Sequence, residues 1–362
     1  MQSALPKRRW PRFDRDRDVH SRDLDDKTAV VLERHLRDLM GWSGLARRPL
    51  DSRVPSAFIG PPICVASLGE SKIYRRDRAG GCRMNVITRK FRVTPLSDVL
   101  GAEISGLDLH QDIDAATAEA LHESWLEFHV LLIRGQRLTA IEHRRFCCCL
   151  GDIQIERTAV DVESKDIAGM LFVSNTREDA ILPNGDMWFH SDQCYFDTPG
   201  KATSLYAIET PTSGGHTRFA NCHLAYDALT EPFKKRLHGL VAMNCYDYPS
   251  NNEYKKTAER SPNAHRFAHP VVRTHPNTGR KALYVNRLMT DYIVDMDEQH
   301  SRELLLSLFD HMEKPEFIYE HSWQPKDLLI WDNRCLVHGR SHFSPSERRL
   351  LRRFALKGDR PR

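Results

Sequence analysis

Two short segments that lie far apart in the sequence constrain this chain more than any other feature. Residues 188–192 read WFHSD, and residues 331–338 read WDNRCLVH. Side chains alternate along a strand, so His190 and Asp192 are expected to point to the same face. Both could then bind one metal ion from a rigid support, with His338 as the candidate third ligand. We expect the fold to bring the two segments together around this site.

Two imidazoles and one carboxylate favour a particular class of metal site. They leave three positions open on an octahedral ion, as in Fe(II) enzymes that bind a bidentate cosubstrate and oxygen. Zinc prefers a tetrahedral site with a single open position. A His-x-Asp pair alone is weak evidence in a chain with 18 histidines. The interpretation therefore depends on the residues that lie beyond His338.

A basic segment, RRLLRR at residues 348–353, comes after His338. On a strand, Arg349 and Arg353 share one face, while Arg348 and Arg352 take the other. A run of arginines is most often a solvated surface, but the apolar neighbours of these residues indicate a buried strand. A buried guanidinium is costly unless it meets an anion, and a carboxylate is its usual partner. The segment thus predicts an anion site.

Weaker signals surround these segments. The turn SGGHT at residues 213–217 leads into an expected strand, where the hydroxyl of Thr217 could donate to a carboxylate oxygen. Threonine in a strand is, however, usually only a strand former. Four further residues are candidate pocket liners, although each is more often a core residue: Trp188, Tyr195, Phe196 and Asn175.

The body of the chain predicts a mainly β fold. Helices are expected at 115–128 after Asp114, from Thr139 to about 150, and at about 297–312. His338 is expected in a loop after a buried strand. The expected strands are 91–96, 101–107, 130–134, 170–175, 187–194, 203–209, 216–219, 239–246, 268–274, 281–285, 328–332 and 348–356. This order predicts a β-barrel or sandwich core with helices packed outside.

The charge distribution divides the chain at Met84. Residues 1–83 hold 18 Lys+Arg and 11 Asp+Glu, a balance of +7, while residues 84–362 hold 35 and 38, a balance of −3. The first segment is Arg-rich with charges of alternating sign, which is typical of solvated chain. We interpret 1–83 as a disordered or non-native N-terminal extension and 84–362 as the folded domain. That body gives no electrostatic reason to expect nucleic acid as a partner.

Cysteine usage and hydropathy predict a cytoplasmic protein. The nine cysteines match no zinc ribbon or disulfide framework, and Cys147, Cys148 and Cys149 are adjacent in an expected helix. We interpret them as reduced thiols. The N-terminus lacks the apolar stretch of a secretory signal. No apolar run approaches the ~20 residues of a membrane span, so no membrane partner is expected.

Residues 89–358 resemble the taurine dioxygenase / 2,4-dichlorophenoxyacetate dioxygenase (TauD/TfdA) family of Fe(II)/2-oxoglutarate-dependent oxygenases. The resemblance rests on several motifs that occur in the family's order and spacing. These are VTPL at 93–96, GAEISG at 101–106, the WFHSD and SGGHT segments, IWDNR at 330–334, His338, and the Arg-Arg-x-x-x-Arg strand.

The resemblance implies a double-stranded β-helix, or jelly-roll, fold. It implies that His190, Asp192 and His338 hold Fe(II), and that the distal carboxylate of 2-oxoglutarate meets Arg349 with help from Thr217. Arg353 matches the family's second arginine, near the cosubstrate or an anionic substrate. The implied reaction uses O2 to hydroxylate a small anionic organic substrate (a sulfonate, sulfate ester or carboxylate) and releases succinate and CO2. Relatives of this kind often form dimers or tetramers.

One departure from the family pattern makes taurine itself doubtful as the substrate. Taurine enzymes carry a histidine-containing loop before the His-x-Asp strand, and here the corresponding residues 154–175 contain no histidine. Two other functions stay open at this point. A zinc-dependent hydrolase could use the same ligands without 2-oxoglutarate, and a degenerate barrel could bind a metabolite without turnover.

Overall fold

The computed structural model describes residues 73–76, 82–85, 90–155, 167–178, 180–181, 186–247 and 261–362. The chain divides into two compact units, Met1–Arg53 and Val54–Arg362, and every described element lies in the second. Two of these elements, β1 (Ile73–Arg76) and β2 (Cys82–Asn85), form an antiparallel pair that includes Met84. A search of the described residues found no helix with the length and apolar character needed to cross a membrane.

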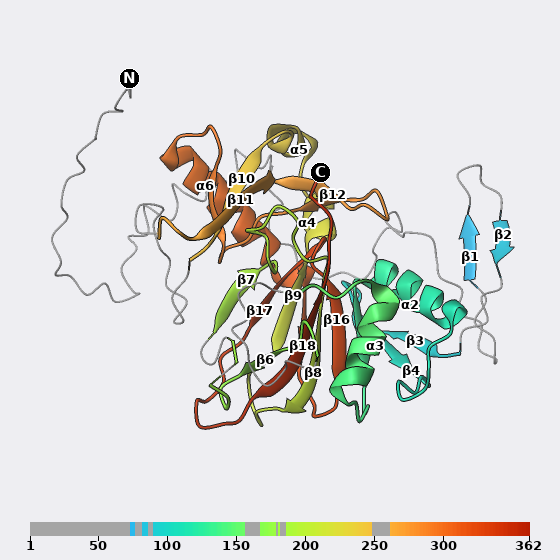
Figure 1. Cartoon of the computed structure of the whole chain (residues 1–362). Helices are drawn as coiled ribbons and strands as arrows, with labels where there is room; N and C mark the ends of the chain where they lie inside the picture. The colour runs from blue at the N-terminus through green and yellow to red at the C-terminus, as the bar shows by residue number, and fades with distance from the viewer. Residues whose placement is uncertain are drawn as a thin grey trace, which may run out of the picture. The chain divides into compact units, whose positions relative to one another are not determined.

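Two sheets form the core of the second unit (Figure 1). Their strands are antiparallel, apart from the parallel pair β4–β5. The larger sheet has the order β3 (Arg92–Pro95), β4 (Ala102–Ser105), β5 (Val130–Ile133), β16 (Leu328–Asp332), β8 (Ala202–Glu209), β18 (Leu350–Leu356) and β6 (Leu171–Ser174). The smaller has the order β15 (Ile318–His321), β9 (Thr217–Asn221), β17 (Leu336–Arg340) and β7 (Met187–His190). This is the predicted jelly-roll core.

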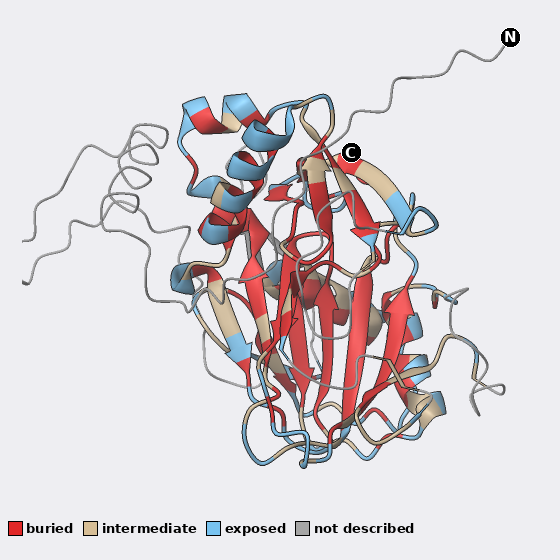
Figure 2. Cartoon of the chain, turned by 90° about the vertical axis from the view of Figure 1, so that its left-hand side faces the viewer, coloured by how far each residue is buried: buried red, intermediate tan, exposed pale blue. Residues whose placement is uncertain are grey.

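Alternation along the central strands separates two apolar layers. In β16, Leu329 and Trp331 pack in the cluster that also holds Phe219 of the smaller sheet. Leu328 and Ile330 face the other way, into a cluster that includes residues of two helices. Figure 2 shows the resulting buried strands in red. Because both faces of the larger sheet are covered at its centre, β5 and β16 are apolar almost throughout.

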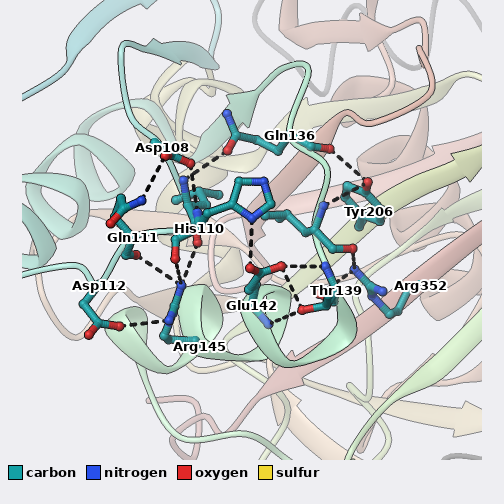
Figure 3. A network of polar contacts seen from close by, with 12 residues as sticks. Asp108, His110, Gln111, Asp112, Gln136, Thr139, Glu142, Arg145, Tyr206 and Arg352 are labelled. Carbon is teal, nitrogen blue, oxygen red and sulfur yellow. Dashed lines mark hydrogen bonds and ion pairs between the residues drawn. The ribbon is translucent and has the colours of Figure 1, made fainter.

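The two helices that cover the larger sheet, α2 (Ala115–Phe128) and α3 (Ala140–Leu150), occupy the predicted ranges. Asp114 caps α2 by accepting a 2.7 Å hydrogen bond from the backbone N–H of Thr117. Thr139 and Glu142 form a reciprocal capping box at the start of α3. Figure 3 shows this end of α3, where Arg145 donates to the carboxylate of Asp112 and to nearby backbone carbonyls.

The remaining elements lie between β9 and β15 in the sequence. They include a three-stranded sheet in the order β11 (His265–Pro270), β10 (Val241–Tyr246) and β14 (Thr290–Ile293), and the two-stranded sheet β12 (Val272–Thr274) and β13 (Lys281–Leu283). The helical elements are α4 (Cys222–Asp227), α5 (Glu231–Leu237), α6 (Glu298–Met312) and the 3-10 turn η3 (Pro315–Phe317). The third predicted helix is α6. Its Leu304, Leu305, Leu308 and Met312 are buried, as its apolar stripe predicts.

Several predictions about local structure were wrong in detail. The expected strand 187–194 ends at His190, because Gln193 adopts a positive φ of 61° and Asp192 lies in the turn. His338 lies within β17 and not in a loop. The expected strand 268–274 is divided between β11 and β12 at Val271. The sequence reasoning also did not anticipate α4, α5, β14, β15 or β17.

Candidate active site

Strand pairing brings the two constraining segments together. His190 ends β7 and lies directly opposite His338 of β17, with 4.1 Å between the two ring centroids. Nε2 of His190 is 3.7 Å from Oδ1 of Asp192, and Nε2 of His338 is 4.0 Å from its Oδ2. The candidate ligand atoms of the three residues all lie within 4.8 Å of one another. The spacing suits three ligands on one face of a single ion.

Hydrogen bonds orient two of these three side chains. Nδ1 of His190 donates to the backbone carbonyl of Trp188 at 2.9 Å, which leaves Nε2 free to bind a metal. Asp192 accepts a hydrogen bond from the hydroxyl of Thr203 and another, at 3.3 Å, from Nη2 of Arg353. His338 is held by its strand and by packing against Trp331, with ring centroids 4.7 Å apart.

The charge states in this cluster are those that a divalent cation needs. Burial lowers the pKa of His338 to about 3, and neighbouring His190 adds to the shift. Burial also lowers the pKa of His190. Burial alone would raise the pKa of Asp192, but Arg353 and the two histidines hold it below its ordinary value. At neutral pH the site therefore presents two neutral imidazoles and one carboxylate, so no proton has to leave before a metal binds.

A cavity of about 360 Å³ opens beside the three side chains. Three arginines, Thr203, Thr217, Gln193 and the three candidate ligands contribute its polar wall, and aliphatic and aromatic residues contribute most of the rest. The lining residues include Leu171, Val173, Ile181, Met187, His190, Asp192, Tyr195, Leu205, Thr217, Tyr246, Met289, Trp331, His338, Arg340, Arg349 and Arg353. An apolar chamber with a few convergent charges is the usual form of a small-molecule site.

Arg349 is the least satisfied polar side chain of the cavity wall. It is 2% exposed, and its Nε and Nη1 have no hydrogen-bond partner in the described structure. Burial lowers its guanidinium pKa well below the usual range, and neighbouring Arg340 adds to the effect. An uncompensated buried cation is expensive, so this end of the cavity is built to receive an anion.

Arg353 and Arg352 lie on the opposite faces that strand alternation predicts, whereas Arg348 precedes β18. Arg353 shares the cavity with Arg349. Arg348 is exposed and pairs with Glu209 at 2.6 Å. Arg352 is buried on the opposite face, where it donates to the backbone carbonyls of Leu138 and Thr139 at 3.0 Å.

Thr217 lies in the cavity wall, and its hydroxyl oxygen already accepts one hydrogen bond. Nε1 of Trp323 donates to Oγ1 of Thr217 at 2.9 Å, so the hydroxyl hydrogen can point elsewhere. The preceding Gly215 has a positive φ of 64°, and a Cβ there would approach Nε of Arg349 to 3.4 Å and a ring carbon of Pro211 to 2.9 Å. Glycine therefore allows the turn to lie against the arginine.

Three polar residues near the site were missed by sequence reasoning: Thr203, Asn333 and Trp323. Nδ2 of Asn333 donates to Thr203 at 3.1 Å, and its Oδ1 accepts from Nε1 of Trp331 at 2.9 Å. The WDN segment therefore supports Asp192 through Thr203. Its position before His338 is the sequence signal that could have indicated this role.

The candidate pocket liners have mixed outcomes. Tyr195 lines the cavity, whereas Trp188, Phe196 and Asn175 are not among its lining residues. Asn175 instead donates to the backbone of Glu347 at 2.8 Å and accepts from the N–H of Arg349, which fixes the start of the arginine strand. Half of the segment 154–175 that lacks the taurine-type histidine, residues 156–166, lies outside the described residues.

Comparison with known proteins identifies the family. The protein-family model described as "Taurine catabolism dioxygenase TauD, TfdA family" matches residues 92–354. The (S)-phenoxypropionate/alpha-ketoglutarate-dioxygenase of Sphingobium herbicidovorans is 31% identical over 278 residues, which cover 74% of this chain and 96% of that protein. The alkylsulfatase of Acinetobacter baylyi is 30% identical over 282 residues, which cover 75% of this chain and 86% of that protein.

A solved structure agrees with these relatives. The crystal structure of AAD-2 in complex with Mn(II) and N-oxalylglycine has a TM-score of 0.64 and 28% identity to this chain, and the match covers 75% of this chain and 98% of that one. The family model, the relatives and the shared jelly-roll core lead to one conclusion: the chain belongs to the TauD/TfdA family and is an Fe(II)- and 2-oxoglutarate-dependent dioxygenase that uses O2.

Proposed function

We propose that His190, Asp192 and His338 hold the Fe(II) of this enzyme, and that Arg349 binds the distal carboxylate of 2-oxoglutarate with help from Thr217. The single observation that carries the proposal is the buried guanidinium of Arg349, two of whose nitrogens have no hydrogen-bond partner in the described structure, in the same cavity as the two histidines and the aspartate. A dicarboxylate would satisfy both ends of this cavity at once, one on the metal and one on the arginine.

The donor set supports this assignment. Two neutral imidazoles and a carboxylate suit Fe(II) and leave room for a bidentate ligand and oxygen. Bound Fe(II) supplies the activation of O2 that couples decarboxylation of 2-oxoglutarate to substrate hydroxylation. The protein's part is to orient Asp192 through Thr203, to fix the cosubstrate through Arg349, and to surround the substrate with apolar walls.

We further propose a small anionic organic substrate, either a carboxylate, a sulfonate or a sulfate ester. Arg353 is one of the three arginines that line the cavity, and its Nη2 donates to Asp192 at 3.3 Å, so it lies next to the proposed metal ligands. The named relatives support this class, since one acts on phenoxypropionate and another is an alkylsulfatase. The aliphatic and aromatic walls favour a substrate with an apolar body over a compact polar one.

For the rest of the chain, we propose that residues 84–362 form the catalytic domain and that 1–83 are an extension not needed for folding. The family model begins at residue 92, which supports this boundary. A protein that starts at Met84 should then be soluble and as active as the full chain, and loss of either property would contradict the boundary.

We also propose a homo-oligomer, a dimer or tetramer. A cytoplasmic location is supported by the free thiols of the described cysteines.

The function is tested by measuring succinate formation with Fe(II), O2 and 2-oxoglutarate across sulfonates, sulfate esters, aryloxy acids and amino acids. We expect succinate to rise with one compound class. The Asp192→Ala protein is the matched control, and its succinate should stay at background with every compound. The proposed site would be contradicted if the wild-type protein formed no more succinate than this control, both with the compounds and from 2-oxoglutarate alone.

A further inference from the structure

A second group of candidate ligands lies outside the active-site cavity: His129, His223 and Cys335. His129 directly follows α2, His223 lies in α4, and Cys335 lies in the turn between β16 and β17. Their candidate ligand atoms are all within 4.8 Å of one another. The three side chains come from distant parts of the sequence, and their exposures are 3%, 0% and 1%.

Both histidines of this group have an unsatisfied ring nitrogen. Nδ1 of His129 and Nε2 of His223 are buried and have no hydrogen-bond partner in the described structure. The other nitrogen of His223, Nδ1, bonds the backbone carbonyl of Lys281 at 2.7 Å, which fixes its tautomer and leaves Nε2 as a lone-pair donor. An unpaired buried polar atom costs stability, so two such atoms beside a thiol require an explanation.

Both rings are also kept neutral, as metal ligands must be. Burial lowers the pKa of His129 to about 3, and His223 contributes to that shift. Burial lowers the pKa of His223 to about 4, against the raising effect of its bond to Lys281. Protonation therefore does not compete for these nitrogens at neutral pH.

In a neighbouring group, His275 with Asp332 and Cys335, the candidate ligand atoms also lie within 4.8 Å of one another. Here, however, the imidazole and the carboxylate already have hydrogen-bond partners. The carboxylate of Asp332 accepts hydrogen bonds from Arg334 at 2.7 and 2.8 Å and from Nε2 of His275 at 3.0 Å. Nδ1 of His275 accepts from the backbone N–H of Thr278 at 3.3 Å. The lone pairs of the first group are the ones left free.

We propose that His129, His223 and Cys335 form a zinc site, distinct from the iron site. Two imidazoles and a thiolate suit Zn(II), with a water molecule completing the tetrahedron. Binding releases the Cys335 proton to solvent and forms the Zn–S bond together with two Zn–N bonds, with no change of oxidation state. The ion would join the end of α2, the start of α4 and the turn before β17, the strand that carries His338.

Cobalt substitution tests the site in the full-length protein. Co(II) bound by a thiolate gives a charge-transfer band in the near ultraviolet, whereas the proposed iron ligands include no sulfur and cannot produce it. Protein stripped with a chelator and titrated with Co(II) should gain this band in full by two equivalents, because the proposed iron site also takes up Co(II), and Zn(II) added afterwards should remove it. A wild-type protein that binds Co(II) without the band would overturn the proposal. A buried water between the two histidines would give this negative result.

Three variants decide which thiol and imidazole are involved. Cys335→Ser should lose the band, while Cys147→Ser, a change at a buried cysteine of α3, should keep it. His223→Asn retains a donor for the Lys281 carbonyl but removes the ligand nitrogen, so it should also lose the band. This variant decides the question if Cys335→Ser does not fold. A band that survives in folded Cys335→Ser or His223→Asn would overturn the assignment.

Asp192→Ala provides a further distinction, because it removes a ligand of the proposed iron site only. The thiolate band should persist in this variant while succinate formation is lost. The zinc site and the proposed function can therefore fail independently of each other.

Discussion

The two ends of the active-site cavity differ in how far the protein satisfies its own polar groups. At the metal end, Asp192 accepts hydrogen bonds from Thr203 and Arg353, and His190 is fixed by the Trp188 carbonyl. At the other end, Arg349 is buried with two nitrogens unpartnered. The first end is largely arranged before any ligand arrives, although Nδ1 of His338 has no hydrogen-bond partner in the described structure. Under the proposed function the second end is completed by an anion, so the protein would give up some of its own stability there in exchange for affinity.

The largest expected effect concerns the metal end. Asp192→Ala removes the one carboxylate of the trio and should abolish succinate formation, because two imidazoles alone do not provide the proposed coordination. Circular dichroism should show an intact fold, since Asp192 lies in a turn and not within a strand. Unchanged activity in this variant would remove Asp192 from the ligand set.

At the cosubstrate end, Arg349→Ala should raise the KM for 2-oxoglutarate strongly. Truncating one partner of a buried, charged hydrogen-bonded pair costs about 3 kcal/mol, which corresponds to roughly a hundredfold. Iron affinity, measured by calorimetry without cosubstrate, should not change. Arg348→Ala is the matched control, because Arg348 is exposed, pairs with Glu209 and does not line the cavity. A normal requirement for 2-oxoglutarate in Arg349→Ala would exclude the proposed role.

The same residue allows a test of stability that does not involve turnover. Replacing Arg349 by Met keeps much of the side-chain volume and removes an uncompensated buried charge. The ligand-free variant should therefore melt at a higher temperature than the ligand-free wild type. Adding 2-oxoglutarate to the iron-loaded proteins should raise the Tm of the wild type further and leave that of Arg349→Met nearly unchanged. A lower Tm for the ligand-free variant would mean that Arg349 is satisfied within the protein.

A smaller effect is expected from Thr203→Val, which removes the hydroxyl that donates to Asp192. Loss of a hydrogen bond to a metal ligand typically costs at least about tenfold in metal affinity. The concentration of iron needed for half-maximal activity should rise accordingly, with the KM for 2-oxoglutarate unchanged at saturating iron. Thr117→Val in α2 controls for the loss of a buried hydroxyl elsewhere.

The smallest expected effect comes from Thr217→Val at the cosubstrate end. A single neutral donor contributes about 1 kcal/mol, so the KM for 2-oxoglutarate should rise about fivefold with little change in iron affinity. This pattern is the reverse of that expected for Thr203→Val, and the pair therefore measures whether the two ends act separately. If both variants weakened the binding of iron and of 2-oxoglutarate equally, the two ends of the cavity would not act separately.

Features set by local sequence were predictable here, and features set by pairing between distant strands were not. The caps at Asp114 and Thr139 placed α2 and α3, and alternation placed Arg349 and Arg353 on one face. The strand that carries His338 was missed because its only support is pairing with β7 and β9, which no local pattern reveals.

The supporting residues escaped prediction for the same reason. Thr203 is ordinary for a buried strand, and its importance comes from the approach of Asp192, eleven residues earlier, across a turn. Trp323 reaches Thr217 over a separation of 106 residues. Short helices such as α4, which begins where the side chain of Asn221 caps it, are also too brief to show a clear apolar period.

The direct opposition of His190 and His338 across β7 and β17 has a consequence for how this chain can change. The positions of these two proposed ligands are set by hydrogen-bonded register and not by the length of chain between them. Insertions or deletions in the intervening loops should therefore leave the ligand geometry intact. A slip of one residue between the two strands would instead turn one imidazole away from the cavity. Changes in the loops can thus create new substrate pockets without moving the two imidazoles.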